Sequence, residues 1–530
     1  MFLRSLTGIN KTGITILFII IGAIILVPII FIFFYSIKIS YEDLDTVLNP
    51  KLLSYTFQTL KLLFYTGLFS LFFSVIPAWV LTNYDIKFKN SFDLLLMLPL
   101  AFPCYIMAFT YVDILGYGGP FYTFCQKNLG YTLEYDVLSI EWLSLFLSLS
   151  LYPYVYATSR VSFLSVSSIY HDLCKSLGLT GIKKFIKIIA PISFWGIASG
   201  ILIVFMEVLN EYGAVNYFGV QTFSVGIFKY WFSLNNKKLA IILSFLLIAI
   251  VMLFLLFSYF IKKRDSKIKS HIKARKIKLY NFKNIYTKII CKTIIFLPII
   301  FGFLIPLLFI FRNVIRNFSD YNFNEVVNGF INSISLSLIT AFIVVLSSFI
   351  ILNYNRLHKN KILDVIIKSL TVGYAVPAAV VGLSIMLIIQ LIVPDFSFLI
   401  GSISLLIYAY VFRYISVAIF PIKNSFSHQP VIYDQLANSL GLSRFKILRK
   451  ITLPLNIYSL IIAFLFVFID TMKELPITLI LRPFNFETLS TLTYEYAIEE
   501  MLSYSALYSL AIILCCAVVI TFVRLFLNHK

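Results

Sequence analysis

The segments DLCKSLGL at 172–179 and QLANSLGL at 435–442 are two copies of one sequence, 263 residues apart. Each copy is followed by Lys-Ile, at 187–188 and 450–451, and then by a proline, Pro191 or Pro454. The same offset carries Glu211 onto Glu474 and Glu207 onto Asp470. Two copies of one unit predict a pseudo-symmetric architecture built from two related halves.

The repeated segments, about 165–190 and 428–453, mix apolar with basic positions and are too polar to cross a bilayer. Gly178 and Gly441 lie in the middle, where a glycine costs a helix about 1 kcal/mol relative to alanine. A turn between two short helices explains these glycines better than one continuous helix. We therefore expect a helix-turn-helix elbow in each half, whereas a simple interfacial anchor helix would need no duplicated glycine.

The composition of the 530-residue chain, 60% hydrophobic and 13% charged, excludes a soluble fold. Apolar runs long enough to cross about 30 Å of hydrocarbon recur along the sequence. We predict an all-α polytopic membrane protein of about twelve transmembrane helices. The expected spans are 13–37, 59–81, 93–115, 140–159, 192–212 and 239–261, then 289–312, 330–353, 369–393, 398–420, 455–472 and 506–527.

Charge placement predicts the topology. The segment 262–288 carries eleven Lys and Arg against the single acid Asp265, and basic residues mark the cytoplasmic side of a membrane protein. We interpret 262–288 as a linker between a first half at 1–261 and a second half at 289–530. Its charge should lie against anionic headgroups, and a topology signal with no further role is the favoured alternative. Both termini and both elbows are then cytoplasmic. Six spans separate the copies, so the halves are parallel six-helix repeats.

The net charge of +20 is explained by basic residues that mark the cytoplasmic loops. The composition therefore gives no reason to expect a nucleic-acid partner. The six cysteines have no disulfide or metal-ligand spacing, and we expect neither a cofactor nor a defined metal site in this chain. The phosphate-cradling pattern Gly, four residues, Gly-Lys-Ser/Thr is missing. The chain is therefore not expected to be an enzyme or to bind nucleotide by that device.

Four acids in or at the edge of spans, Glu207, Glu211, Asp470 and Glu474, are candidates for a substrate pathway. Ionisable groups in apolar runs are costly and usually face partners or a water-filled cavity, and their hard oxygens suit a trivalent cation. A structural alternative stays open, because an acid at the membrane boundary can also cap a loop helix.

The repeated segments resemble the EAA loop of ABC importer permeases, whose pattern is Glu-Ala-Ala, three residues, Gly, nine residues, then Ile, any residue, Leu and Pro. The glycine and proline spacing fits in both halves, whereas Asp172 and Gln435 replace the glutamate. In this family the loop is the coupling helix that docks onto a separate ATPase, which binds ATP and Mg²⁺. The resemblance assigns ATPase coupling to Asp172, Gly178, Pro191, Gln435, Ala437, Gly441 and Pro454.

A wider resemblance rests on MEVLNEYGAV at 206–215 and KELPITL at 473–479, which look like the iron(III) permease branch of that family, whose members fuse both halves. It implies a multi-pass protein of the bacterial inner membrane that takes ferric iron from a periplasmic binding protein and works with two ATPase copies. Fused thiamine permeases and the polyamine and anion permeases remain alternatives for the substrate. A secondary transporter and a non-transport scaffold remain alternatives of other classes.

Overall fold

A computed structural model describes residues 19–28, 30, 31, 34, 50–130, 135–165, 174, 176–179, 181–269, 285–358 and 360–528. Its regular elements are helices throughout this part of the chain. The helices form two compact units: unit 1 comprises Met1–Ser40 and Val327–Thr491, and unit 2 comprises Tyr41–Val326 and Leu492–Lys530. These packing units do not coincide with the sequence halves at 1–261 and 289–530, whose boundaries remain a prediction.

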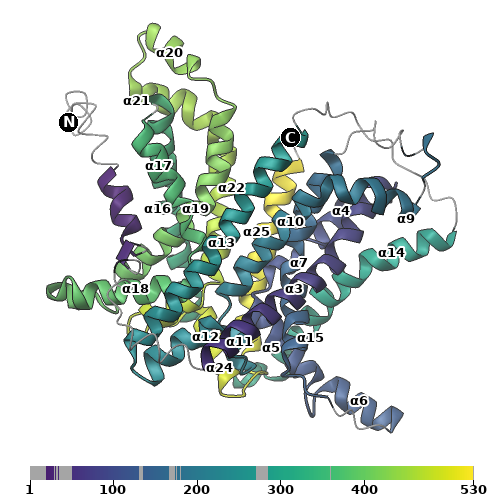
Figure 1. Ribbon diagram of the computed structural model, residues 1–530. Helices are drawn as coiled ribbons and strands as arrows, with labels where there is room; N and C mark the ends of the chain where they lie inside the picture. Colours follow the sequence, from purple (N-terminus) through teal and green to yellow (C-terminus); the bar gives the residue numbers. More distant parts are fainter. Residues whose placement is uncertain are drawn as a thin grey trace. The chain divides into compact units, whose positions relative to one another are not determined.

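Unit 2 contains the helices from α3 to α15, together with the C-terminal helix α25, which is yellow in Figure 1. Its α-helices are α3 (Pro50–Asn83), α4 (Lys89–Leu95), α5 (Cys104–Leu115), α6 (Pro120–Leu129), α7 (Ile140–Ser165), α9 (Gly181–Lys184), α10 (Ala190–Asn210), α11 (Gly213–Tyr217), α12 (Phe223–Phe228), α13 (Lys237–Lys269), α14 (Ile285–Ile299), α15 (Ile305–Arg316) and α25 (Ala506–Asn528). Short 3₁₀ elements are η2 (Leu98–Ala101) and η6 (Phe318–Asp320), and π-helical turns are η3 (Phe185–Ile189), η4 (Lys229–Ser233) and η5 (Ile300–Leu304).

Unit 1 is built mainly from the second half of the sequence. Its α-helices are α16 (Phe323–His358), which enters the unit at Val327, α17 (Lys361–Leu370), α18 (Ala378–Leu391), α19 (Ile403–Ser427), α20 (Ile432–Ser439), α21 (Arg444–Ile447), α22 (Leu453–Met472) and α23 (Pro476–Leu481). Helix α24 (Leu489–Ile498) leaves the unit after Thr491. The unit also has η7 (Gly373–Ala375), η8 (Pro394–Leu399) and a π-helical turn, η9 (Leu448–Thr452).

The predicted all-α polytopic architecture is confirmed. Among the described residues, eight helices are long and apolar enough to cross a bilayer, and two bent pairs raise that number to ten. The first predicted span, 13–37, is described only in part, as the short apolar helix Ile19–Pro28. The fourth corresponds to α7, which is long enough but less apolar. Twelve spans thus remain a prediction, and residues 270–284 of the predicted linker lie outside the described residues.

The two bent pairs are the third and ninth predicted spans. Lys89–Ala101 meets Cys104–Asn128 at 90°, and Lys361–Ala375 meets Ala378–Leu391 at 113°. Each break falls at a proline, Pro103 or Pro377, which has no N–H for the helical ladder and forces its predecessor into an extended conformation. The bends therefore follow directly from the sequence.

Helix α7 lies against α3 and α10, and its burial explains its modest hydropathy. Buried hydroxyls along it bond to the helix's own backbone, as Ser144 does to the carbonyl of Ile140 at 2.6 Å. A Cβ added at Gly200 of α10 would lie 2.2 Å from Oγ1 of Thr158 and 2.8 Å from Cα of Val155. The small residues Gly196 and Gly200, one turn apart, thus allow two backbones to approach closely.

We expect Gly200→Leu to lower the thermal stability of the purified protein markedly, because the side chain has no space between α10 and α7. The measurement is fluorescence-detected size exclusion after heating. Ala198→Leu, a half-exposed position on the same helix, is the matched control and should melt close to wild type. Equal melting of both variants would contradict this account of the packing.

Candidate functional site: the coupling elbows and the acidic loops

The elbow of unit 1 consists of α20, a turn at Gly441, and α21. Gly441 has a φ of +80°, a left-handed conformation that favours glycine. Its N–H donates to the carbonyl of Asn438 at 2.9 Å, and the N–H of Leu442 donates to the carbonyl of Ala437 at 3.1 Å. This pair of bonds is a Schellman motif, which ends α20 and turns the chain. In Figure 1 the elbow extends beyond the ends of α17 and α22.

The first repeat has the same local geometry. Gly178 has a φ of +66°, and the N–H of Leu179 donates to the carbonyl of Cys174 at 2.8 Å. Cys174 and Ala437, which occupy equivalent positions, are both buried, so this position accepts only a small side chain. Asp172 lies outside the described residues, and the side chain of Gln435 is exposed.

A buried polar cluster anchors the elbow of unit 1. The carboxylate of Asp434, on α20, pairs with the guanidinium of Arg356, on α16, at 3.0 Å. Arg356 also stacks over the ring of Phe426, 5.1 Å from its centroid. Asn456, on α22, donates to the side-chain oxygen of Gln429 at 2.7 Å. The ion pair ties α20 to the end of α16, the stacking joins α16 to α19, and the amide bond joins α22 to the segment that precedes α20. No local sequence pattern indicates these contacts.

Each elbow joins its span through a π-helical turn. In η3 the N–H of Ala190 bonds to the carbonyl of Phe185, and in η9 that of Leu453 bonds to the carbonyl of Leu448. Pro191 and Pro454 follow directly, in the first turn of α10 and of α22. A proline ring clashes with the carbonyl four residues earlier, and widening the preceding turn relieves that clash. The helix therefore continues through both prolines.

The turn of each elbow exposes apolar side chains. Leu177 is 61% exposed and Leu440, at the equivalent position, is 82% exposed. In unit 1 further exposed apolar residues surround the turn: Ile432, Tyr433, Leu436 and Phe445. Such a patch on a segment too polar to enter the bilayer is typical of a surface that a partner covers.

The acids Glu211 and Glu474 cap short helices in the loops that follow α10 and α22. Glu211 accepts a hydrogen bond from the N–H of Ala214 at 3.0 Å, and Glu474 accepts one from the N–H of Ile477 at 3.1 Å. A carboxylate is stabilised at a helix N-terminus by the unpaired N–H groups and the helix dipole. This capping is the structural alternative that the sequence left open, and it occurs in both repeats.

Burial raises the pKa of the Tyr494 hydroxyl well above its ordinary value, and the neighbouring Tyr212 and Glu211 add to the effect. Tyr494 thus stays neutral beside Glu211 and accepts a hydrogen bond from the side chain of Asn216 at 2.9 Å.

Glu474 is also part of a buried ion pair within unit 1. The guanidinium of Arg413 lies 3.7 Å from its carboxylate, both side chains are 5% exposed, and the hydroxyl of Tyr414 donates to the same carboxylate. Arg413 further donates to the carbonyl of Val376 at 3.2 Å, at the bend of the ninth span. A charge inside an apolar run is a signal that could have identified Arg413 from the sequence.

The remaining two pathway candidates, Glu207 and Asp470, are half-buried on α10 and α22. Within unit 1, the hydroxyl of Tyr414 donates to the backbone carbonyl of Asp470 at 3.3 Å. Across the described part of the chain, the structure has no cluster of three or more His, Cys, Asp or Glu side chains that could hold a metal ion. The pathway role of the four acids stays a prediction.

The helical fold with its broken spans is that of a polytopic membrane protein, and comparisons with known proteins show which class of membrane protein it resembles. Residues 350–529 match the family described as binding-protein-dependent transport system inner membrane component. The resemblance to the ABC importer permeases is thereby confirmed.

Among individual proteins, the chain is similar over nearly its whole length to the Fe(3+)-transport system permease protein FbpB 2 of Haemophilus influenzae, with 24% identity over 94% of this chain and 95% of that protein. The sulfate transport system permease protein CysT of Salmonella typhimurium is 27% identical over 32% of this chain and 60% of its own length. The molybdate/tungstate transport system permease protein WtpB of Methanocaldococcus jannaschii is 26% identical over 33% of this chain and 66% of its own length.

We predict that Arg413→Met destabilises the protein by about 3–5 kcal/mol, because it leaves the carboxylate of Glu474 buried without its counter-charge. The double variant Arg413→Met/Glu474→Gln should recover much of this loss, since glutamine can still accept the N–H of Ile477. Thermal unfolding in detergent measures both.

Ser150→Ala provides the comparison in unit 2, where the hydroxyl of Ser150 donates to the carbonyl of Phe102 at 2.6 Å, at the bend of the third span. Losing this neutral hydrogen bond should cost only about 1 kcal/mol. An Arg413→Met protein as stable as Ser150→Ala would show that the buried ion pair is not important for stability.

Proposed function

We propose that this chain is the transmembrane subunit of an ATP-driven importer that moves ferric iron from a periplasmic binding protein into the cytoplasm. The assignment of ferric iron as the substrate rests on the similarity, over nearly the full length of both chains, to a protein named as an Fe(3+)-transport permease. The sulfate and molybdate permeases match only about a third of this chain, so they support an anionic substrate less well.

In this proposal the energy comes from partners. Two copies of a separate ATPase, which holds ATP and Mg²⁺, each dock against an elbow. The exposed Leu177 and Leu440 support this role, because both occupy the same position of the turn and would be covered by such a partner. The π-helical continuity into α10 and α22 would carry a displacement of the elbow into the span.

The transport cycle follows from this coupling. Closure of the ATPases on nucleotide pulls the elbows around Gly178 and Gly441 and switches the permease between outward-open and inward-open states. In the proposed orientation both termini are cytoplasmic and the binding protein delivers iron on the opposite side. Glu207, Glu211, Asp470 and Glu474 are the proposed oxygen donors along the path, with Glu474 also serving the structural contacts described above.

The function is tested by crosslinking and purifying the chain from native membranes and identifying its partners by mass spectrometry. The recovered binding protein is assayed for bound metal. An ATPase together with an iron-loaded binding protein is the expected result. A binding protein loaded with thiamine, polyamine or an oxyanion would refute iron while keeping the importer. Absence of any ATPase, under conditions that preserve a known importer complex, would favour a secondary transporter.

Coupling is tested by Gly441→Asp, which we expect to abolish iron uptake while membrane insertion stays normal. A Cβ at Gly441 meets no atom within 4 Å in the described part of the chain, so the side chain changes the docking surface without a clash, while the φ of +80° also strains the turn. Gly130→Asp is the matched control, because Gly130 also has a positive φ, of 69°, and open surroundings. Normal uptake by Gly441→Asp would refute the coupling role.

The pathway role is tested by the double variant Glu211→Gln/Glu474→Gln. Glutamine retains an acceptor for the N–H groups of Ala214 and Ile477, so the helix caps can persist while two charges are removed. Because Glu474→Gln alone leaves Arg413 buried without its counter-charge, the same measurement is made with Arg413→Met added, and only folded protein is compared. We expect iron uptake in reconstituted vesicles to fall at least about tenfold, since a trivalent cation depends strongly on nearby charge. Transport at the wild-type rate would exclude both acids from the path.

A further inference from the structure

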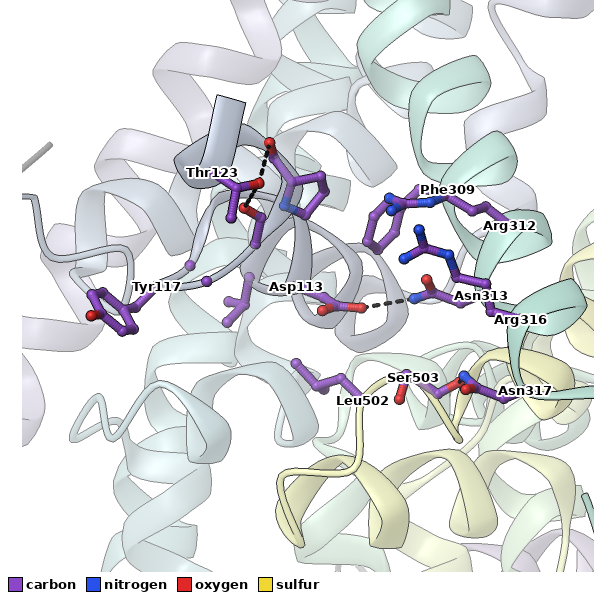
Figure 2. A pocket seen from close by; sticks show the side chains of 15 residues that line it. Asp113, Tyr117, Thr123, Phe309, Arg312, Asn313, Arg316, Asn317, Leu502 and Ser503 are labelled. Carbon is purple, nitrogen blue, oxygen red and sulfur yellow. Dashed lines mark hydrogen bonds between the residues drawn. The ribbon is translucent and has the colours of Figure 1, made fainter. Parts of the chain in front are cut away.

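A polar cavity of about 690 Å³ lies inside unit 2, between α5, the glycine-rich turn before α6, and α15 (Figure 2). Leu502 and Ser503, in the loop before α25, close another side. Within this unit the cavity is at the end opposite α9, and so opposite the elbow (Figure 1). None of the residues singled out from the sequence lines it.

Two arginines dominate the charge of the cavity. Arg312 and Arg316 are one turn apart on α15, and Figure 2 shows both guanidinium groups extending toward α5 and the glycine-rich turn. In the described part of the chain, no carboxylate lies within 4 Å of either guanidinium. Arg312 stacks over Phe309, 5.7 Å from the ring centroid, which holds its planar group at the wall.

The acid of the cavity lining points toward α15, where it is bonded to an amide and lies within the electrostatic reach of Arg312. Asp113 accepts a hydrogen bond from the side chain of Asn313 at 2.8 Å, as the dashed line in Figure 2 shows. One carboxylate against two guanidinium groups leaves the cavity with a positive charge. Two guanidinium groups one helical turn apart present several N–H donors in a fixed arrangement that suits carboxylate and phosphate oxygens.

The glycine-rich turn shapes the opposite wall. A Cβ at Gly116 would lie 2.6 Å from the carbonyl of Val112, and one at Gly119 would lie 2.6 Å from the carbonyl of Asp113. Only glycine therefore lets this turn fold back against the end of α5. Tyr117 and Thr123 add hydroxyl groups to the lining. The cavity is a shaped, polar chamber whose volume falls in the range of about 300–1,000 Å³ found for small-molecule sites.

We propose that this cavity is a binding site for a small soluble oxyanion, a molecule bearing carboxylate or phosphate groups, held by Arg312 and Arg316. Asp113 limits the affinity by repulsion and, through Asn313, fixes the α15 wall against α5. The binding itself does not depend on the proposed function. In the orientation of the proposed importer the cavity lies on the side where the binding protein delivers its cargo, and this placement rests on the proposed function.

The test is isothermal titration of the purified full-length chain in lipid nanodiscs, without ATPase or binding protein. The probes are citrate and inorganic phosphate, with acetate and chloride for comparison. We expect saturable binding of citrate or phosphate, and at least about tenfold weaker binding in Arg312→Gln/Arg316→Gln, because each charged hydrogen bond is worth about tenfold or more. Lys127→Gln, an exposed charge on α6 outside the lining, should bind like wild type.

Asp113→Asn gives a change of opposite sign. It keeps an acceptor for the amide of Asn313 and removes the only negative charge of the cavity, so citrate should bind severalfold more tightly. Absence of saturable binding to wild type would overturn the proposal, as would equal affinity of wild type and a correctly folded arginine double variant. Either result would leave the importer function intact, because its partners take no part in the assay.

Discussion

The backbone of a buried, broken helix must satisfy its carbonyls without water, and this constraint organises the sites described above. Prolines break the third and ninth spans and leave the carbonyls of Phe102 and Val376 at the bends. In unit 2 a hydroxyl, that of Ser150, donates to the first, and in unit 1 the guanidinium of Arg413 donates to the second. The arginine in turn requires a counter-charge in a medium of low dielectric, and Glu474 supplies it.

Ser150 and Arg413 are related by the same 263-residue offset as the elbows. In both halves this position donates a hydrogen bond to the carbonyl at the bend, but the donor is a hydroxyl in one half and a guanidinium in the other. Glu211 and Glu474 both cap a helix, but only Glu474 also faces an arginine at that repeat position. The halves are therefore alike in backbone and unlike in electrostatics. When both halves lie on one chain, each half always occupies the same position in the protein, so each can acquire its own side chains.

Much of the fold was predictable from the sequence, because apolar runs, prolines and the repeated glycines act locally. Runs of hydrophobic residues placed the spans, and the turns at Gly178 and Gly441 lie where the repeat places them. Contacts between distant residues were not predictable. The pair of Asp434 with Arg356, 78 positions apart, and the cavity around Arg312 depend on which helices pack together, and no local pattern encodes that. The packing units likewise differ from the sequence halves.

The π-helical turns at the base of the elbows have a mechanical consequence. A proline inside a helix is usually a hinge, because a missing hydrogen bond lets the two sides bend independently. Here η3 and η9 keep the ladder closed up to Pro191 and Pro454, so α21 and α22 form a single lever. A lever without a joint transmits torque as well as displacement. Rotation of the elbow about the helix axis would therefore turn every side chain along α22, including Asp470, eighteen positions beyond Thr452.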